Sequence, residues 1–188
     1  ELLESNTESV VVVDEAYIDF AESGSSAVAL INKYDNLLVV QTMSKSRSLA
    51  GLRIGYAMGS AELIEGLERI KNSFNSYPLG HVQIAAGVAA FKDNEYFEET
   101  RQLVIRSRDQ LSQQLASMGF EVLPSAANFV FVRHCDYSAE VLAQSLREKN
   151  IIVRYFNKPR INEFLRITVG NEEQNQLLIN NLTAIFES

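Results

Sequence analysis

The sequence predicts an α/β domain with a mostly parallel sheet, followed by a smaller α+β domain. Residues 10–13 and 37–40 are two apolar runs of the aliphatic, β-branched kind that is typical of buried strands. A stretch of helical periodicity, residues 82–118, comes next and suits a connection between two domains. We therefore expect residues 1–80 to belong to the first domain and residues 81–188 to comprise the connecting helix and the second domain.

Each element of the first domain has a local signal. The run at 10–13 has no polar position, so we expect a strand that is covered on both faces. Residues 25–34 could form a short helix, and residues 52–57 have the pattern of another strand. Ser60 is the expected N-cap of a helix that extends to about Lys71, because acidic residues follow Ser60 in the first turns.

The second domain begins with the long helix at 82–118, which we expect to bend near Asp93. The runs that follow have strand or helix periodicity, as expected of an α+β unit. The expected strands are 119–124, 128–132, 151–155 and 164–169, and the expected helices are 138–149 and 172–186.

Composition and charge disfavour several classes of protein. The formal net charge of -7 gives no basic field that would attract phosphate backbones, so nucleic acid is not an expected partner. The single cysteine, Cys135, cannot form an internal disulfide, and the two histidines, His81 and His134, lack metal-ligand spacing. We expect these three residues to be structural or solvent-exposed, and we expect no metal.

The sequence carries no membrane or secretory signal. No apolar run approaches the roughly 20 residues that cross a bilayer, and no charged-then-apolar leader opens the chain. These features predict a cytoplasmic protein with no membrane partner. The chain begins at Glu1 without an initiator Met and enters a strand-like run almost at once, so we expect a fragment of a longer protein.

Polar residues follow both apolar runs of the first domain. Asp14 and Glu15 end the first run, and Thr42, Ser44 and Lys45 lie just after the second. In open α/β sheets, ligands bind beyond the carboxyl ends of the strands. The sequence therefore predicts chemistry at these two strand ends.

Two arginines of the second domain have unusual surroundings. Arg166 lies inside the apolar run 164–169, where a guanidinium is costly unless it meets an anion, and a carboxylate is its natural bidentate partner. Arg154 ends the short run 151–153 and is equally compatible with a surface charge on an edge strand. The sequence thus indicates an anion site near Arg166.

Four motifs occur in the order that is seen in fold-type I pyridoxal-phosphate-dependent aminotransferases. They are D-E-A-Y at 14–17, S-K at 44–45 with L-A-G-L-R-I-G at 49–55, N-F at 128–129 and L-R-I-T-V-G at 165–170. Together they cover essentially the whole chain, which most resembles the histidinol-phosphate aminotransferase type. The resemblance implies the C-terminal part of the large domain followed by the small domain of that fold.

The resemblance implies that Lys45 is the lysine that carries pyridoxal phosphate. Its amine must be unprotonated when it attacks, which a desolvated pocket or neighbouring cations favour. Asp14 resembles the carboxylate that keeps the cofactor's ring nitrogen protonated, and Tyr17 resembles the tyrosine that bonds the phenolic oxygen. Taken alone, these residues would be a solvated loop lysine, a strand-terminal aspartate and a half-buried aromatic.

The resemblance also assigns the residues that bind the cofactor's phosphate. Arg53 resembles the phosphate-binding arginine, with Ser44 and Thr42 as hydroxyl ligands. Phosphate recognition needs a fixed donor fork and small hydroxyls, which these residue types supply. The alternative for Arg53 is a solvated charge at a strand edge, and Arg47 receives no role.

The resemblance implies that residues of the second domain bind the substrate. Arg166 resembles the arginine that binds the substrate's α-carboxylate, and Arg154 resembles the second arginine that binds the substrate's phosphate. Asn128 resembles a supporting asparagine near the substrate carboxylate. The implied partners are small amino-acid and oxo-acid substrates, and the implied assembly is a homodimer.

The implied function is transamination between histidinol phosphate and 2-oxoglutarate. Alternatives of the same kind are a threonine-phosphate decarboxylase and an aromatic or broad-specificity aminotransferase. A different class is the aminotransferase-like sensor domain of a transcription regulator, and an inactive truncated product is also possible. Other cofactor-binding parts of the family should precede Glu1, so we expect this chain alone to bind the cofactor weakly or not at all.

Overall fold

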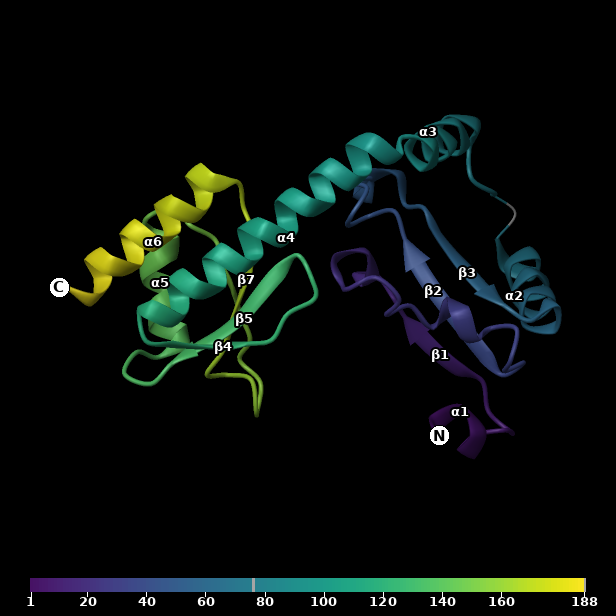
Figure 1. Cartoon of the computed structure of the whole chain (residues 1–188), viewed down its shortest axis with the longest axis horizontal. Coiled ribbons are helices and arrows are strands. Elements are labelled where there is room, and N and C mark those ends of the chain that lie inside the picture. The colour runs from purple at the N-terminus through teal and green to yellow at the C-terminus, as the bar shows by residue number, and fades with distance from the viewer. Residues whose placement is uncertain (76, 188) are drawn as a thin grey trace. The chain divides into compact units, whose positions relative to one another are not determined.

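The computed structural model describes residues 1–75 and 77–187 and consists of two compact units, Glu1–Glu99 and Thr100–Ser188. The boundary between the units lies within helix α4 (Asn94–Ser117). Figure 1 shows that each unit contains its own sheet and helices that lie beside it. The domain boundary after residue 80 that the sequence suggests stays a prediction.

The sheet of the first unit contains β1 (Val11–Asp14), β2 (Leu37–Thr42) and β3 (Gly55–Gly59), in that order. β1 and β2 are parallel, with Asp14 opposite Val40, so their carboxyl ends lie at the same edge. β3 is antiparallel to β2 and starts at this edge, with Gly55 opposite Thr42. The topology therefore gathers the residues that follow β1 and β2 at one end of the sheet (Figure 1).

The two faces of β1 differ in exposure. Val12 is 57% exposed, whereas Val11 and Val13 are half-buried. In β2, by contrast, Leu37 and Val39 are completely buried. The expectation that residues 10–13 are covered on both faces is wrong for the described residues, because they leave the face that bears Val12 exposed.

The first unit also contains helices and short 3₁₀ turns. They are α1 (Leu2–Ser5), α2 (Ala61–Phe74), α3 (His81–Lys92) and the 3₁₀ turns η1 (Ile18–Phe20), η2 (Ala27–Leu30) and η3 (Ala50–Leu52). Ser60 caps α2 as predicted, since its hydroxyl accepts the Leu63 N–H at 3.5 Å. The expected helix at 25–34 is only the turn η2, and the strand expected from residue 52 starts at Gly55.

The long helix expected at 82–118 is two helices, α3 and α4, which are separated at Asp93. The backbone of Asp93 has ψ of 75°, which ends α3. Its carboxylate accepts the Tyr96 N–H at 3.2 Å and so caps the beginning of α4. Within the described part of the chain, no helix is both long and apolar enough to cross a membrane.

The second unit has a four-stranded antiparallel sheet that packs against helices. The strand order is β4 (Phe120–Leu123), β5 (Phe129–His134), β7 (Leu165–Thr168), β6 (Arg154–Tyr155). Helices α5 (Ala139–Glu148) and α6 (Glu172–Phe186) and the second part of α4 bury leucines against one face of this sheet. The completely buried members are Leu111, Leu115, Val130, Val132, Leu146 and Leu182.

Most elements of the second unit match the sequence expectation, and β6 is the exception. The strand expected at 151–155 is reduced to Arg154 and Tyr155. Ile151 donates its N–H to Leu146 O at 2.9 Å, so the chain here is still bonded to the end of α5. It therefore cannot pair with β7 until Arg154, which lies opposite Arg166.

Helix α6 offers a test of this core with an internal control. Leu182 is completely buried, whereas Leu177 on the same helix is 53% exposed. We expect Leu182→Ala to lower the free energy of unfolding by about 2–5 kcal/mol, because it leaves a cavity in the core. Leu177→Ala should change it by less than about 0.5 kcal/mol. Urea unfolding followed by circular dichroism measures both, and equal effects would contradict this core.

Candidate functional site

Lys45 lies in a loop that leaves β2 and returns to β3. The loop is closed by the Met43 N–H, which donates to Ile54 O at 3.1 Å, and by the Leu49 N–H, which donates to Met43 O at 3.0 Å. Met43 and Ile54 are buried. Lys45 is thus carried by a loop with its own hydrogen bonds and a packed base.

The side chain of Lys45 is exposed. Its Nζ lies 5.5 Å from the centre of the Tyr17 ring, so the structure brings together two of the predicted cofactor-binding residues. The described residues do not bury this amine, and the desolvated pocket that we expected around Lys45 is therefore not formed by them.

The three predicted phosphate-binding residues lie on the two ends of the loop. Thr42 Oγ1 is 2.9 Å from Ser44 Oγ and 3.1 Å from Ile54 O, and it accepts the Ser44 N–H at 3.1 Å. Arg53 directly precedes Ile54, has a left-handed backbone with φ of 55°, and is exposed. Its Nη1 donates to Ala50 O at 3.1 Å. The Thr42 and Ser44 hydroxyls form a pair, and the backbone of Arg53 joins the same segment.

Asp14 is exposed at the end of β1. Its Oδ1 accepts the Ala16 N–H at 3.0 Å, which is the bond of a strand-terminal aspartate that caps the next turn. This bond holds the carboxylate at the sheet edge beyond which the Lys45 loop begins. The capping role and the proposed cofactor role are compatible, because a carboxylate accepts several hydrogen bonds.

Glu15 is the residue that sequence reasoning missed. Its side chain is only 6% exposed, and its two oxygens accept hydrogen bonds from Ser26 Oγ at 2.8 Å, Ala27 N at 2.6 Å and Gln41 Nε2 at 2.8 Å. A buried carboxylate requires such partners. The signal in the sequence was an acidic pair after an apolar strand, of which only Asp14 was given a role.

The Glu15 network continues across the sheet to β3. Gln41 accepts a hydrogen bond from Tyr56 Oη at 2.8 Å, and these two residues lie opposite one another in β2 and β3. Burial raises the pKa of the Tyr56 phenol, and the nearby carboxylate of Asp19 adds to the rise. The chain of hydrogen bonds from Tyr56 through Gln41 to Glu15 therefore joins all three strands at the edge where Lys45 and Asp14 lie.

In the second unit, Arg166 and Arg154 lie opposite one another on β7 and β6. The guanidinium carbon of Arg166 is 5.3 Å from the centre of the Phe129 ring and 5.9 Å from that of Phe156. Arg154 lies 5.4 Å from the same Phe156 ring. No ion pair among the described residues joins either guanidinium to a carboxylate. This sheet face therefore presents two adjacent cations beside aromatic rings.

Asn128 lies just before β5 and next to the end of β7. Its carbonyl accepts the Val169 N–H at 2.9 Å, three residues after Arg166. The hydroxyl of Ser125 donates to Phe129 O at 2.6 Å and supports the same turn. The structure thus places Asn128 just before β5, which pairs with the strand that carries Arg166.

His134 has a structural environment. Its Nδ1 accepts the Asp136 N–H at 3.1 Å, and its Nε2 lies 3.1 Å from Met118 O. The ligand atoms of His134, Cys135 and Asp136 lie within 4.8 Å of one another. Because both ring nitrogens already have hydrogen-bond partners, His134 is not arranged as a metal ligand. Cys135 is exposed, as expected.

Known proteins of one family are similar to this chain. The family described as aminotransferase class I and II matches residues 1–182. The histidinol-phosphate aminotransferase of Acinetobacter baylyi is 60% identical over 182 residues, which are 97% of this chain and 50% of that protein. The enzyme of the same name from Pseudomonas putida is 61% identical over 183 residues, or 97% of this chain and 52% of that protein. The chain spans about half the length of the curated relatives it matches.

Solved structures of enzymes with the same name are similar to this chain in fold. The histidinol-phosphate aminotransferase from Clostridium acetobutylicum has a TM-score of 0.90 at 26% identity and covers 99% of this chain and 57% of its own. The enzyme from Sinorhizobium meliloti, solved in complex with pyridoxal-5'-phosphate, has a TM-score of 0.82 at 27% identity, over 96% of this chain and 50% of that chain. The predicted fold class, part of a fold-type I large domain followed by an α+β small domain, is confirmed.

The Glu15 network can be tested by one substitution. In Glu15→Gln, the new NH2 group would face either Gln41 Nε2 or the Ala27 N–H, which both donate to the carboxylate, and Gln41 cannot invert without losing its bond from Tyr56. We expect a loss of about 1–3 kcal/mol in the free energy of unfolding, the cost of leaving buried polar groups unpaired. Urea unfolding measures it. Glu22→Gln, at an exposed position, is the matched control, and a Glu15 variant as stable as this control would contradict the network.

The raised pKa of Tyr56 predicts how the free energy of unfolding depends on pH. Its pKa is raised in the folded state, so the unfolded chain ionises first, near pH 10, and stability falls as the pH rises from there through the folded-state pKa. We expect the free energy of unfolding to decline less steeply between about pH 9 and 11 in Tyr56→Phe than in the unmodified protein. Tyr77→Phe, at a position that is 87% exposed, should keep the original slope. Equal slopes in all three proteins would refute the role of burial.

Proposed function

Because the chain belongs to the class I and II aminotransferase family, we propose that it forms part of a pyridoxal-phosphate-dependent enzyme that transaminates histidinol phosphate and 2-oxoglutarate. The observation that carries the proposal is the position of Lys45, in a closed loop after β2, at the sheet edge that also bears Asp14. Identity of about 60% to histidinol-phosphate aminotransferases supports the choice of substrates. We propose a homodimer as the working assembly.

The donor set of the first unit fits the parts of pyridoxal phosphate. Lys45 offers an amine to the aldehyde carbon, and Asp14 offers a carboxylate to the ring nitrogen. Tyr17, whose ring lies beside Lys45 Nζ, offers a phenol to the phenolic oxygen. The paired hydroxyls of Thr42 and Ser44, together with the Arg53 guanidinium, would hold the phosphate. Asp14, Lys45 and Arg53 are all exposed, so the groups are accessible to a ligand.

Each residue then has a chemical task in the exchange of the amino group. When bound, the cofactor supplies an electron sink for the negative charge that develops at the substrate's α-carbon. Asp14 stabilises the protonated ring nitrogen on which that sink depends. Lys45 Nζ would take the proton from the substrate's α-carbon and deliver it to the cofactor carbon that carried the aldehyde, the general acid and base step of transamination. Tyr17 orients the cofactor ring through its phenol.

The second unit is proposed to bind the anionic groups of the substrates. Like charges directly opposite one another in a sheet are destabilising, so Arg154 and Arg166 are best explained by an anionic ligand. Arg166 would bind the anionic groups of both substrates in turn, the carboxylate of 2-oxoglutarate or glutamate and the phosphate of histidinol phosphate, and Arg154 would assist. Asn128, just before the neighbouring strand β5, would support the carboxylate group.

Lys45→Ala tests the proposal in the full-length gene product. We expect the purified protein with pyridoxal phosphate to show the visible absorbance of a covalently held cofactor, and we expect this substitution to abolish it, because no other amine occupies the loop. With histidinol phosphate and 2-oxoglutarate, the unmodified protein should form glutamate without releasing carbon dioxide.

The control is Lys92→Ala, at an exposed position at the end of α3, which should leave the absorbance unchanged. An unmodified protein without the absorbance would refute the cofactor assignment. Release of carbon dioxide from a phosphorylated amino acid would instead refute the transamination and identify a decarboxylase.

A further inference from the structure

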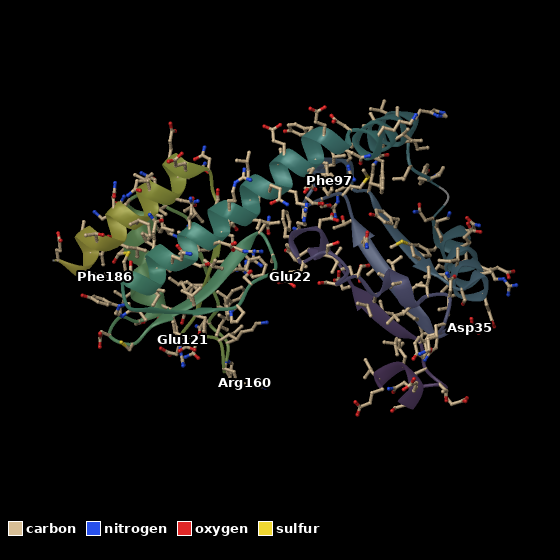
Figure 2. All side chains as sticks on the ribbon, viewed as in Figure 1. Glu22, Asp35, Phe97, Glu121, Arg160 and Phe186 are labelled. Carbon is tan, nitrogen blue, oxygen red and sulfur yellow. The ribbon has the colours of Figure 1, made fainter. Side chains whose placement is uncertain are left out.

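Arg47 lies two residues after Lys45, and its guanidinium is held by α3 and α4. Its Nη1 donates to Ala90 O, a carbonyl in the last turn of α3. Its guanidinium carbon lies 4.0 Å from the centre of the Phe97 ring and 4.7 Å from that of Phe91. Phe97 lies in the first turn of α4 (Figure 2). One arginine of the Lys45 loop therefore contacts both helices where they meet.

The contacts of Arg47 meet a physical requirement of the α3 end. The last four carbonyls of a helix lack partners within the helix, and a cation there also interacts favourably with the helix dipole. Arg47 supplies both the hydrogen bond and the charge, and its planar group matches two aromatic faces. The half-buried charge of Arg47 is thus compensated by Ala90, Phe91 and Phe97.

Two further contacts hold the same loop against α3. Gln83 Nε2 donates to Leu52 O at 2.7 Å. At Gly87 the helix backbone approaches so closely that a Cβ there would lie 3.1 Å from Ile54 Cδ1 and 3.7 Å from Met43 Sδ. The base of the loop therefore packs on one side of α3, while Arg47 reaches the end of that helix.

We propose that Arg47 is a positioning residue for Lys45, which fixes the loop to the junction of α3 and α4 so that the Lys45 amine meets the cofactor in one orientation. The inference rests on the proposed function of Lys45. The side chain of Lys45 is exposed and its Nζ lies beside the Tyr17 ring, so contacts made by neighbouring residues must order its loop. Ser46, next to Lys45, is buried and donates to Asp19, and Arg47 is the next anchored residue and the one that reaches α3 and α4.

The test compares Arg47→Met, Arg47→Lys and Arg69→Met in the full-length gene product. Met keeps the apolar stem and removes the charge and the fork, whereas Lys keeps the charge. Arg69 is an exposed arginine of α2 that pairs with Glu65 at 2.6 Å and serves as the matched control. The measurements are titration with pyridoxal phosphate, followed by the bound-cofactor absorbance, and hydrogen exchange of the segment 43–54 by mass spectrometry.

We expect Arg47→Met to weaken cofactor binding roughly tenfold, the order expected for loss of a desolvated cation–π contact, and to speed exchange of the segment 43–54. Arg47→Lys should restore part of both, and Arg69→Met should match the unmodified protein. Cofactor binding and exchange in Arg47→Met equal to those of Arg69→Met would overturn the proposal.

Phe97→Leu tests the positioning role of Arg47 if Arg47→Met does not fold. This variant removes the nearer ring and leaves Arg47 and Ala90 in place. Weaker cofactor binding at an unchanged unfolding midpoint supports the positioning role, and unchanged binding overturns it. If even the unmodified protein shows no bound-cofactor absorbance, the proposed function fails, and the exchange of segment 43–54 still decides whether Arg47 orders the loop.

Discussion

A buried carboxylate at the end of β1 organises the sheet edge on which the candidate site is built. Glu15 accepts hydrogen bonds from the turn at Ser26 and Ala27 and from Gln41 of β2, while its own N–H extends the β1–β2 ladder to Val40. A buried carboxyl group is stable in such a position only when its oxygens have hydrogen-bond partners. The strand end and the turn are therefore fixed by the same group.

The Lys45 loop is held on two sides, by the Glu15 network in the sheet and by Arg47 at the helices. On the sheet side, Gln41 joins Glu15 to Tyr56, so the strands that begin and end the loop have a fixed spacing. On the helix side, Arg47 contacts the end of α3 and the start of α4. Neither Gln41 nor Arg47 carries out chemistry in the proposed reaction. Both limit where the Lys45 amine can lie, and orientation of reacting groups is a large part of what an enzyme supplies.

The second unit obtains its anion site from strand alternation. One face of β7 buries Leu165 and Ile167 in the core, so Arg166 must lie on the opposite face. The register with β6 then places Arg154 beside it, and Phe156 lies near both guanidiniums. A pair of cations in this arrangement fits the doubly anionic substrates of the proposed transamination.

Local pattern in the sequence by itself determined most of the helices and strands, including the bounds of α6, the Ser60 cap and the position of Lys45 after a buried strand. Periodicity and capping involve residues within a few positions of one another. Only the tertiary structure decided the partners of Glu15 and Arg47, which lie 11 to 50 residues away. It also decided the exposed face of β1 and the shortened β6, because coverage and pairing depend on neighbours that are distant in the sequence.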